Sequence, residues 1–421
     1  MNEALKEIRR KSKSFQHADF LPTIFGEFRN DAVTGAVPVV LFGAGSAGKE
    51  LYPILRLHGV EPACFCDNNP ERIGELHCGL PVISVPELCR EHRKSLIVVT
   101  IGAHGDEVRR QLLDQGLEDA RIRTISNLEA LCYYTHLAQW YWTEEDLLAH
   151  GDELLEVYDF LSDQKSRDIF TSRIALFVGG ADYESFRDFI SKFSDIRHEK
   201  GSNFQECMRS TNYDSESYLQ FNNDLITLGA DEVLVDGGAY TGDSTLEFIN
   251  ACERHSLTYR KIICYEPDSK IFSELQKNTS RYSSISLRSF GLWSHTSTIQ
   301  FADSSILRPG STRIVSAYEK NDDLPGGASG FDEVPVTSID EDLRDEAVTI
   351  IKMDVEGAEM NALQGARKTI ERCRPKLIIS AYHKRNDLFE LPLLIHRMAP
   401  GYKIYFRHFS SNFGETTLFA L

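Results

Sequence analysis

Two glycine-rich turns carry the residue types that could bind a ligand and act on it. The first turn runs from Gly43 to Lys49 (GAGSAGK), contains no acidic residue and ends in a lysine. The second runs from Asp236 to Asp243 (DGGAYTGD) and has an aspartate at each end. Glycines let a backbone approach a ligand closely, and the start of a helix attracts negative charge. The different charges of the two turns therefore predict different ligands.

Nucleotide binding is the prediction for the first turn. The turn follows the apolar run PVVLF and precedes ELYPILRLHG, so it joins a predicted strand to a predicted helix. Asp67 ends the next apolar run, where an acidic side chain can hold a ribose hydroxyl. The alternative is that the glycines only make the tight turn. The predicted ligand-binding residues here are Gly43, Gly45, Ser46, Gly48, Lys49 and Asp67.

The two carboxylates of the second turn would repel a pyrophosphate and attract a cation. A ligand with an ammonium and a sulfonium group suits them, and Coulomb attraction in a partly desolvated cleft is strong enough to discriminate. S-adenosylmethionine carries both groups at its methionine end. Glu266 ends the next strand (KIICYEP), placed to accept hydrogen bonds from both ribose hydroxyls. The alternative for Asp236 and Glu266 is a capping or ion-pairing role.

Methyl transfer to a hydroxyl requires alignment and removal of the hydroxyl proton. Asp354 and His383 end two successive predicted strands, so we expect both on one rim of the sheet. His383, with an ordinary pKa of about 6.5, is the favoured general base, and a structural hydrogen bond is the alternative. A divalent cation held by Asp354 and Glu356 would also acidify the hydroxyl. No metal is favoured, because few oxygen ligands are visible and Glu356 and Glu359 also suit a helix start.

The elements that must position these residues alternate between strands and helices. Residues 36–130 contain PVVLF, ACFCD and SLIVVTIG separated by helical patterns, which predicts a small doubly wound domain. Residues 205–421 repeat the alternation and end in a hairpin, YKIYFRHF with ETTLFAL. Residues 131–204 have helical spacing and predict a connector, and residues 1–35 a helical extension. The fold class is α/β, with two Rossmann-like domains joined by a helical connector.

Two further segments are predicted to flank the second domain. Tyr213, Tyr218 and Phe221 could line a substrate lid or pack in the core. Residues 303–330 are polar and rich in glycine, which predicts a mobile surface loop.

Composition narrows the classes of partner. A formal charge of −17 argues against nucleic acid, and no apolar run approaches the roughly 20 residues that span a bilayer. The N-terminus lacks the apolar core of a signal peptide, and the nine cysteines are scattered. These features predict a cytoplasmic protein with reduced thiols. A homodimer is left open.

The C-terminal half resembles the FkbM family of methyltransferases. The resemblance runs through VLVDGGAYTGDSTLEFI, IICYEPDSKIFSELQKN, SFGLW, IIKMDVEGAEMNALQGA and RPKLIISAYHKRNDL, of which IKMDVEGAEMNALQGA is the most specific. It implies a class I methyltransferase fold, a seven-stranded sheet with an antiparallel last strand, and methylation of hydroxyls on sugars or secondary metabolites. The cofactor-binding residues it implies are Asp236, Gly237, Gly238, Ala239, Tyr240, Thr241, Gly242, Asp243, Glu266, Pro267, Asp268, Gly291, Leu292 and Asp354.

The N-terminal stretch is similar to the nucleotide-sugar-binding domain of bacterial sugar O-acyltransferases. The shared features are the glycine turn, the DNNP that begins at Asp67, and the following GLPV. Those enzymes often carry a second acid and a histidine near these positions, whereas Asn68 follows Asp67 here. The resemblance therefore implies ligand binding or a scaffold role for this domain.

Together these patterns predict an S-adenosylmethionine-dependent O-methyltransferase. Its acceptor is predicted to be a small molecule or glycan: a hydroxyl of a sugar, a glycan or a nucleotide-linked sugar. One alternative is a non-catalytic sensor or scaffold that binds a nucleotide sugar. Another is a nicotinamide dehydrogenase built on the first turn, for which no Ser-Tyr-Lys or comparable set is visible.

Overall fold

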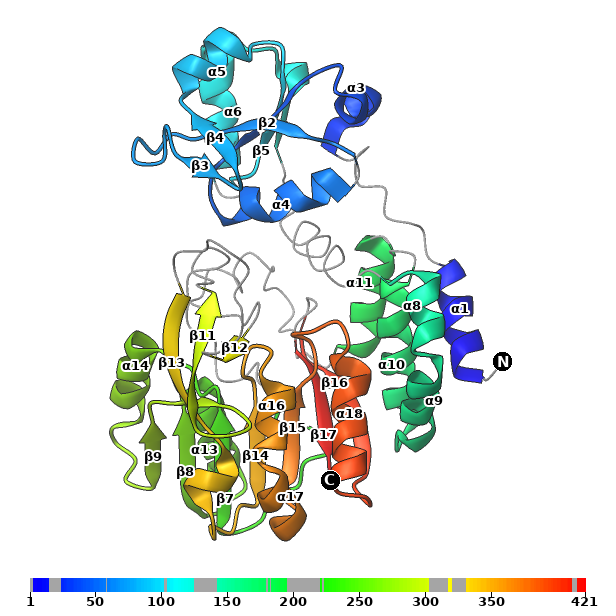
Figure 1. Cartoon of the computed structure of the whole chain (residues 1–421), viewed down its shortest axis with the longest axis vertical. Coiled ribbons are helices and arrows are strands. Elements are labelled where there is room, and N and C mark those ends of the chain that lie inside the picture. Colours follow the sequence, from blue (N-terminus) through cyan, green and yellow to red (C-terminus); the bar gives the residue numbers. More distant parts are fainter. Residues whose placement is uncertain are drawn as a thin grey trace.

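A computed structural model covers the chain and describes most of its residues. The described residues are 3–14, 24–57, 59–101, 104–124, 142–178, 181, 183–194, 220–221, 223–302, 317–319, 331–410 and 415–421. Tyr213, Tyr218 and most of the predicted loop 303–330 lie outside them. Figure 1 shows a smaller sheet with its helices, a group of helices, and a larger sheet with helices along it.

The N-terminal sheet is mostly parallel and places its first glycine turn at a topological switch point. Its strands are β1 (Val39–Phe42), β2 (Pro62–Cys66), β3 (Leu76–His77), β4 (Leu80–Ile83), β5 (Leu96–Val99) and β6 (Ile122–Thr124). The strand order is β3-β4-β2-β1-β5-β6, and only the β3–β4 pair is antiparallel. Because β1 lies between β2 and β5, the loop after it opens into the crevice where such sheets bind ligands.

Helices cover both faces of this sheet. They are α3 (Arg29–Thr34), α4 (Ser46–Leu57), α5 (Val85–Glu91) and α6 (Gly105–Asp114), with short turns η1 (Gly26–Phe28) and η2 (Asp119–Arg121). Val39 and Leu41 share a core with α3 and α4, whereas Val40 and Phe42 share one with α5 and α6. Alternate side chains of a strand point to opposite faces, so a strand buried on both faces is apolar throughout.

The helical group consists of segments far apart in the sequence. It contains α1 (Glu3–Ser14), α8 (Glu144–Ala149), α9 (Gly151–Phe160), α10 (Gln164–Phe177) and α11 (Tyr183–Phe193). In Figure 1, α1 lies beside these helices and not beside the N-terminal sheet. The Lys11 ammonium donates to the hydroxyls of Thr171 and Ser172 at 2.8 and 3.0 Å, which ties α1 to α10.

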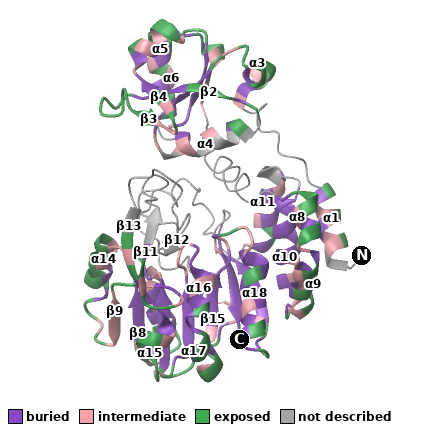
Figure 2. Cartoon of the chain, in the orientation of Figure 1, coloured by how far each residue is buried: buried purple, intermediate pink, exposed green. Residues whose placement is uncertain are grey.

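The larger sheet has seven strands and confirms the predicted fold class. Its strands are β7 (Glu232–Gly237), β8 (Tyr259–Tyr265), β9 (Ile285–Arg288), β14 (Ile350–Met353), β15 (Lys376–Ser380), β16 (Ile404–His408) and β17 (Thr416–Ala420). They are arranged in the order β16-β17-β15-β14-β7-β8-β9. The last strand, β17, runs antiparallel to both of its neighbours, as the closing hairpin predicted. Figure 2 shows that the strands are largely buried.

The remaining elements follow the strands of this sheet. The helices are α13 (Asp243–Arg254), α14 (Ser269–Thr279), α15 (Ile339–Leu343), α16 (Glu359–Gln364), α17 (Arg367–Cys373) and α18 (Asp387–Met398). A small second sheet contains β10 (Gly291–Leu292), β11 (Ser297–Ala302), β12 (Ala317–Glu319) and β13 (Phe331–Thr337). None of the described helices is long and apolar enough to cross a membrane.

The helical group closes the exposed edge of the larger sheet. The backbone N–H groups of Ile404 and Phe406, on edge strand β16, donate to the hydroxyls of Ser162 and Ser166 at 3.0 and 2.9 Å. Helices α9, α10 and α11 contribute to the same hydrophobic core as the sheet. An unpaired strand edge is a site of aggregation, so these helices protect the sheet. The domain boundaries given above stay predictions.

Candidate active site

The glycine turn after β7 presses directly against the end of β14. Gly238 has φ +69°, and a Cβ there would lie 1.8 Å from the carbonyl oxygen of Asp354. Gly242 has φ +98° and begins α13. Only glycine tolerates both the positive φ and the close backbone approach. The turn is thus held at the switch point between β7 and β14, where a ligand of an open α/β sheet binds.

Asp236 points inward from this turn. Its side chain is fully buried, and one carboxylate oxygen accepts hydrogen bonds from the hydroxyls of Ser244 (2.7 Å) and Thr245 (2.6 Å). The other oxygen lies 3.2 Å from the Lys352 ammonium. The expected direct attraction of a ligand cation by Asp236 is therefore screened by an internal cation.

Lys352 is a buried charged residue beside the turn that the sequence reasoning missed. It lies on β14, is 3 % exposed, and also donates to the carbonyl oxygen of Gly238 at 3.0 Å. Burial lowers the pKa of Lys352, but the nearby carboxylates of Asp236, Asp354 and Asp243 raise it by more, so the net pKa lies above the ordinary value. A lysine inside the apolar run IIKM was the available signal.

Asp243 and Glu266 are the acidic groups that remain near the turn. Asp243 is the first residue of α13 and is half-buried. Burial raises its pKa, Lys352 lowers it and Asp236 raises it, and the net pKa lies above the ordinary value. Glu266 follows β8, is 7 % exposed, and accepts from the backbone N–H groups of Tyr240 (3.1 Å) and Asp268 (2.9 Å). Burial raises the pKa of Glu266 to about 7. These groups lie where the sequence predicted a cofactor.

The other predicted cofactor residues surround the same turn. Leu292 lies against Gly237, where a Cβ would be 2.6 Å from its side chain, and Gly291 lies beside Pro267. Asp268 caps α14 by accepting from the N–H groups of Lys270 and Ile271, so its carboxylate is engaged. Of the remaining turn residues, Ala239 is buried, Tyr240 is 39 % exposed, and the Thr241 carbonyl accepts from Asn278.

Four side chains meet at the ends of β14 and β15, and we call them the rim cluster: Asp354, Glu356, Glu359 and His383. The Nε2 atom of His383 lies 3.3 Å from Asp354 Oδ1 and 3.6 Å from Glu356 Oε2. Its Nδ1 atom lies 2.8 Å from Glu359 Oε1. The sequence predicted Asp354 and His383 on one rim, and the structure brings them together.

Tyr382 extends the rim cluster towards β17. Its hydroxyl lies 3.2 and 3.1 Å from the two oxygens of Asp354, and 3.3 Å from Glu415 Oε1. Neither Tyr382 nor Glu415 was singled out from the sequence, because nothing local marks them. Burial, with a further contribution from Asp354, raises the pKa of Glu415 to about 8. The rim cluster and Glu415 together bring four carboxyl groups close to one another.

The charge of His383 differs from the expectation. Its burial lowers the pKa, but Glu359, Asp354 and Glu356 raise it more, to about 10. The ordinary pKa of about 6.5 assumed from the sequence is therefore wrong. In this arrangement both ring nitrogens are protonated at neutral pH, and the positive charge of the ring balances the surrounding carboxylates.

Phe221 packs in the core and does not form a lid. It is 1 % exposed, and its ring meets that of Phe248 edge-on at 5.3 Å. Of the two interpretations for this aromatic group, core packing holds for the one member that the structure describes.

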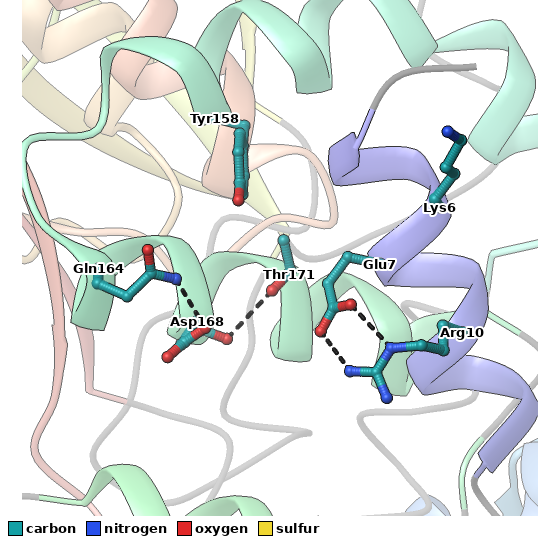
Figure 3. A pocket seen from close by; sticks show the side chains of 7 residues that line it. All are labelled: Lys6, Glu7, Arg10, Tyr158, Gln164, Asp168 and Thr171. Carbon is teal, nitrogen blue, oxygen red and sulfur yellow. Dashed lines mark hydrogen bonds and ion pairs between the residues drawn. The ribbon is translucent and has the colours of Figure 1, made fainter.

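Among the described residues, two cavities are lined by residues outside the glycine turn. One, of about 190 Å³, is bounded by α1, α9 and α10, and Figure 3 shows Arg10 paired with Glu7, two of the residues that line it. No predicted site residue lines it. The other has a volume of about 270 Å³ and is lined by Asp146, His150, Lys384, Arg385, Asn386 and Glu390. One of these residues, Lys384, directly follows His383 in the sequence. Its place beside the rim cluster makes it the cavity nearer to the predicted chemistry.

In the N-terminal domain, Asp67 holds the glycine turn in place. Its two oxygens accept from the backbone N–H groups of Ala44 (2.7 Å) and Asn69 (2.8 Å), and Arg72 lies 3.5 Å away. Gly43 has φ +115°, and a Cβ on Gly48 would lie 2.1 Å from the Gly43 carbonyl oxygen. Both glycines are thus required by the turn itself.

The remaining predicted residues of this turn lie at the start of α4. Ser46 begins the helix, and Lys49 is half-buried within it. Gly45 is less restricted: a Cβ there would meet only the Arg72 guanidinium, at 3.5 Å. Gly45 is therefore the position of this turn that leaves room for a ligand.

Comparison with known proteins agrees with this geometry. Residues 236–403 match the family model described as Methyltransferase FkbM domain, a span that contains the acidic turn, Glu266 and the rim cluster. The crystal structure of Methyltransferase FkbM from Methylobacillus flagellatus is 20 % identical with a TM-score of 0.60, covering 100 % of this chain and 99 % of that chain.

Other matches are more distant. Fibrillarin of Aeropyrum pernix with natively bound S-adenosyl-L-methionine is 10 % identical with a TM-score of 0.28, covering 47 % of this chain and 70 % of that chain. No curated protein matches the chain. The resemblance to sugar O-acyltransferases stays a prediction. Residues 236–403 are therefore similar to the FkbM methyltransferase domain, and the chain has an α/β fold of the Rossmann-like methyltransferase type.

Proposed function

We propose that the C-terminal domain is an S-adenosylmethionine-dependent O-methyltransferase acting on a hydroxyl of a sugar, a glycan or a nucleotide-linked sugar. The observation that carries the proposal is the buried carboxylate of Glu266 beside the glycine turn, directly after the strand next to β7. The match to the FkbM domain supports methyl transfer as the activity.

The residues around the turn fit this cofactor. Each oxygen of Glu266 accepts one backbone N–H, which leaves further lone pairs for two ribose hydroxyls. The half-buried carboxylate of Asp243 would attract the amino group, and Gly291 and Leu292 would flank the adenine. When bound, S-adenosylmethionine supplies a methyl group on a positively charged sulfur.

The rim cluster would handle the proton of the acceptor hydroxyl. Asp354 and His383 lie 3.3 Å apart, and Tyr382 donates to Asp354, so the carboxylate is held in one orientation. The fixed carboxylate of Asp354 can accept a hydrogen bond from an entering hydroxyl and take its proton, and the positively charged ring of His383 beside it stabilises the charge of the rim cluster. The alternative function, a non-catalytic sensor or scaffold, uses the same fold without turnover, so measured methyl transfer separates the two.

Cofactor binding is expected to strengthen as pH rises through about 7, because the ionised form of Glu266 is the better acceptor for ribose hydroxyls. A carboxyl group with a pKa of about 7 in the folded protein is about one-tenth ionised at pH 6. The dissociation constant should therefore be about tenfold higher at pH 6 than at its plateau above pH 8. Calorimetry with S-adenosylmethionine on the full chain measures it.

Glu266→Gln should remove this pH dependence and weaken binding at pH 8. Glu253→Gln is the matched control, because Glu253 is an exposed carboxylate on α13. An unchanged dissociation constant in Glu266→Gln at every pH would contradict the assignment of the ribose site. Binding without methyl transfer to any hydroxyl acceptor would favour the sensor.

We also propose that the turn after β1 binds a nucleotide diphosphate, the ligand expected from its sequence. The support is its position at the switch point of the first sheet, with Arg72 and Lys49 beside it and open space at Gly45. Asp67 holds the turn through one backbone hydrogen bond to each of its oxygens, and its further lone pairs remain for a ribose hydroxyl, as predicted.

Gly45→Asp should abolish nucleotide binding, because it adds a carboxylate where the phosphates would lie. The melting temperature of the full chain, measured with a panel that includes uridine diphosphate, tests this effect. Gly45→Ala is the control, since a methyl group fits at this position without a charge. S-adenosylmethionine affinity should stay the same in both variants. If no nucleotide shifts the melting temperature of the unmodified chain, the turn has only a structural role.

A further inference from the structure

The rim cluster gathers oxygen and nitrogen donors from three separate places in the sequence. Asp354 follows β14, Glu359 begins α16, and His383 follows β15. Strands β14 and β15 are parallel neighbours, so their carboxyl ends lie side by side. One ligand atom from each of these three residues lies within 4.8 Å of the other two.

We propose that the rim cluster binds a divalent metal ion on the Nε2 side of His383. That nitrogen faces Asp354 at 3.3 Å and Glu356 at 3.6 Å, so two carboxylates lie near the same ring nitrogen. A bound ion would replace the proton that this nitrogen carries at neutral pH. The Asp354 and Glu356 side chains are 17 % and 39 % exposed, which leaves the site open to an acceptor on one side.

The other side of the ring has the arrangement that supports a metal ligand. Glu359 Oε1 lies 2.8 Å from His383 Nδ1 and also accepts from the backbone N–H of Val355 at 2.9 Å. A histidine that binds a metal commonly donates its other N–H to a carboxylate, which fixes the ring and increases its basicity. Both side chains are at least nine-tenths buried, so this pair is rigid.

Glu359 supplies a second observation that a cation belongs here. Its Oε2 atom is buried and has no hydrogen-bond partner among the described residues. A buried carboxylate oxygen without a partner is costly unless positive charge lies nearby. The ammonium of Lys352, on β14, is engaged by Asp236 and Gly238.

The donor set indicates the class of ion and of acceptor. Carboxylates suit Mg²⁺ and Mn²⁺ and imidazole suits later first-row ions, so a mixed set is compatible with Mn²⁺. Such an ion keeps coordination positions open beyond three protein ligands. Together with the proposed function, this predicts an acceptor whose reacting hydroxyl has a second oxygen adjacent to it, so that both oxygens bind the ion.

Mn²⁺ binding to the chelator-treated full chain tests the site without measuring activity. Electron paramagnetic resonance of free Mn²⁺ should show one bound ion per chain. Glu359→Gln should weaken binding by about tenfold or more, as expected when the residue supporting a metal-bound histidine is lost. Asp354→Asn should weaken it at least as much. Glu247→Gln is the control, because Glu247 is also a buried carboxylate with an unpartnered oxygen but lies on α13.

The outcomes separate this inference from the proposed function. No bound Mn²⁺ in the unmodified chain, or equal affinity in all three variants, would overturn the metal site. The melting temperature of each chelator-treated variant shows whether it is folded, and calorimetry with S-adenosylmethionine on the unmodified chain measures cofactor binding separately. Cofactor binding without Mn²⁺ binding would leave the methyltransferase proposal intact, and Mn²⁺ binding without cofactor binding would overturn that proposal alone.

Discussion

Replacing His383 with alanine is expected to lower turnover by about 10²–10⁴-fold, the usual loss when a group that handles the proton is removed. The affinity for S-adenosylmethionine should change by less than about twofold, because His383 contacts Asp354, Glu356 and Glu359 of the rim cluster. Steady-state methyl transfer and calorimetry on the same preparation measure the two quantities. A fall in turnover with constant cofactor affinity identifies an effect on the chemical step.

His255→Ala is the matched control for this variant. His255 is exposed at the end of α13, so its removal should leave both turnover and affinity unchanged. A loss of less than about fivefold in His383→Ala would mean that alignment of the two reactants alone carries the rate. Loss of cofactor binding together with activity would instead indicate that the rim cluster maintains the fold of the glycine turn.

Replacing Lys352 with methionine is expected to destabilise the protein by about 3–5 kcal/mol, because it leaves the fully buried carboxylate of Asp236 without its cation. The hydroxyls of Ser244 and Thr245 would still bind that carboxylate but cannot balance its charge. Urea unfolding at neutral pH measures the change. The double variant with Asp236→Asn should recover part of the loss, since it removes the unpaired charge.

Lys261→Met provides the comparison for a lysine in the same sheet. Lys261 pairs with Glu346 at 2.8 Å, but both side chains are partly exposed, so its loss should cost about 1 kcal/mol or less. Equal destabilisation by Lys352→Met and Lys261→Met would contradict the importance of the buried pair. Such a result would also remove the reason for treating Lys352 as the internal counter-ion of the acidic turn.

The sequence alone determined the elements and the order in which they occur. Runs such as EVLVDGG and TIIKMDVEG are apolar on both faces, which only a central strand with helices on each side can bury. The closing runs YKIYFRHF and ETTLFAL are joined by a short polar turn, and they form the antiparallel pair β16 and β17. These properties depend on residues near one another in the chain, so local patterns were sufficient.

The same local patterns could locate ligand-binding turns but not the partners of their charged groups. Asp236 was expected to face a ligand cation, whereas it pairs with Lys352, which is more than a hundred residues away in the sequence but lies on the neighbouring strand. Asp67 was expected to hold a ribose, and the fold adds a second role, because its two oxygens accept from the backbone N–H groups of Ala44 and Asn69. The sequence shows the same aspartate whether its carboxylate binds a ligand or holds the fold together, and only the surrounding residues distinguish the two roles.

Tertiary structure alone decided the charge of the rim and the packing of the helices. His383 was assigned an ordinary pKa, but folding places three carboxylates around its ring, and their Coulomb energy exceeds the cost of burying the imidazolium. Helix α1 joins the distant α10 because its Lys11 finds hydroxyl partners there. Periodicity is a property of neighbouring residues and specifies elements, whereas burial and electrostatics depend on residues that only the completed fold brings together.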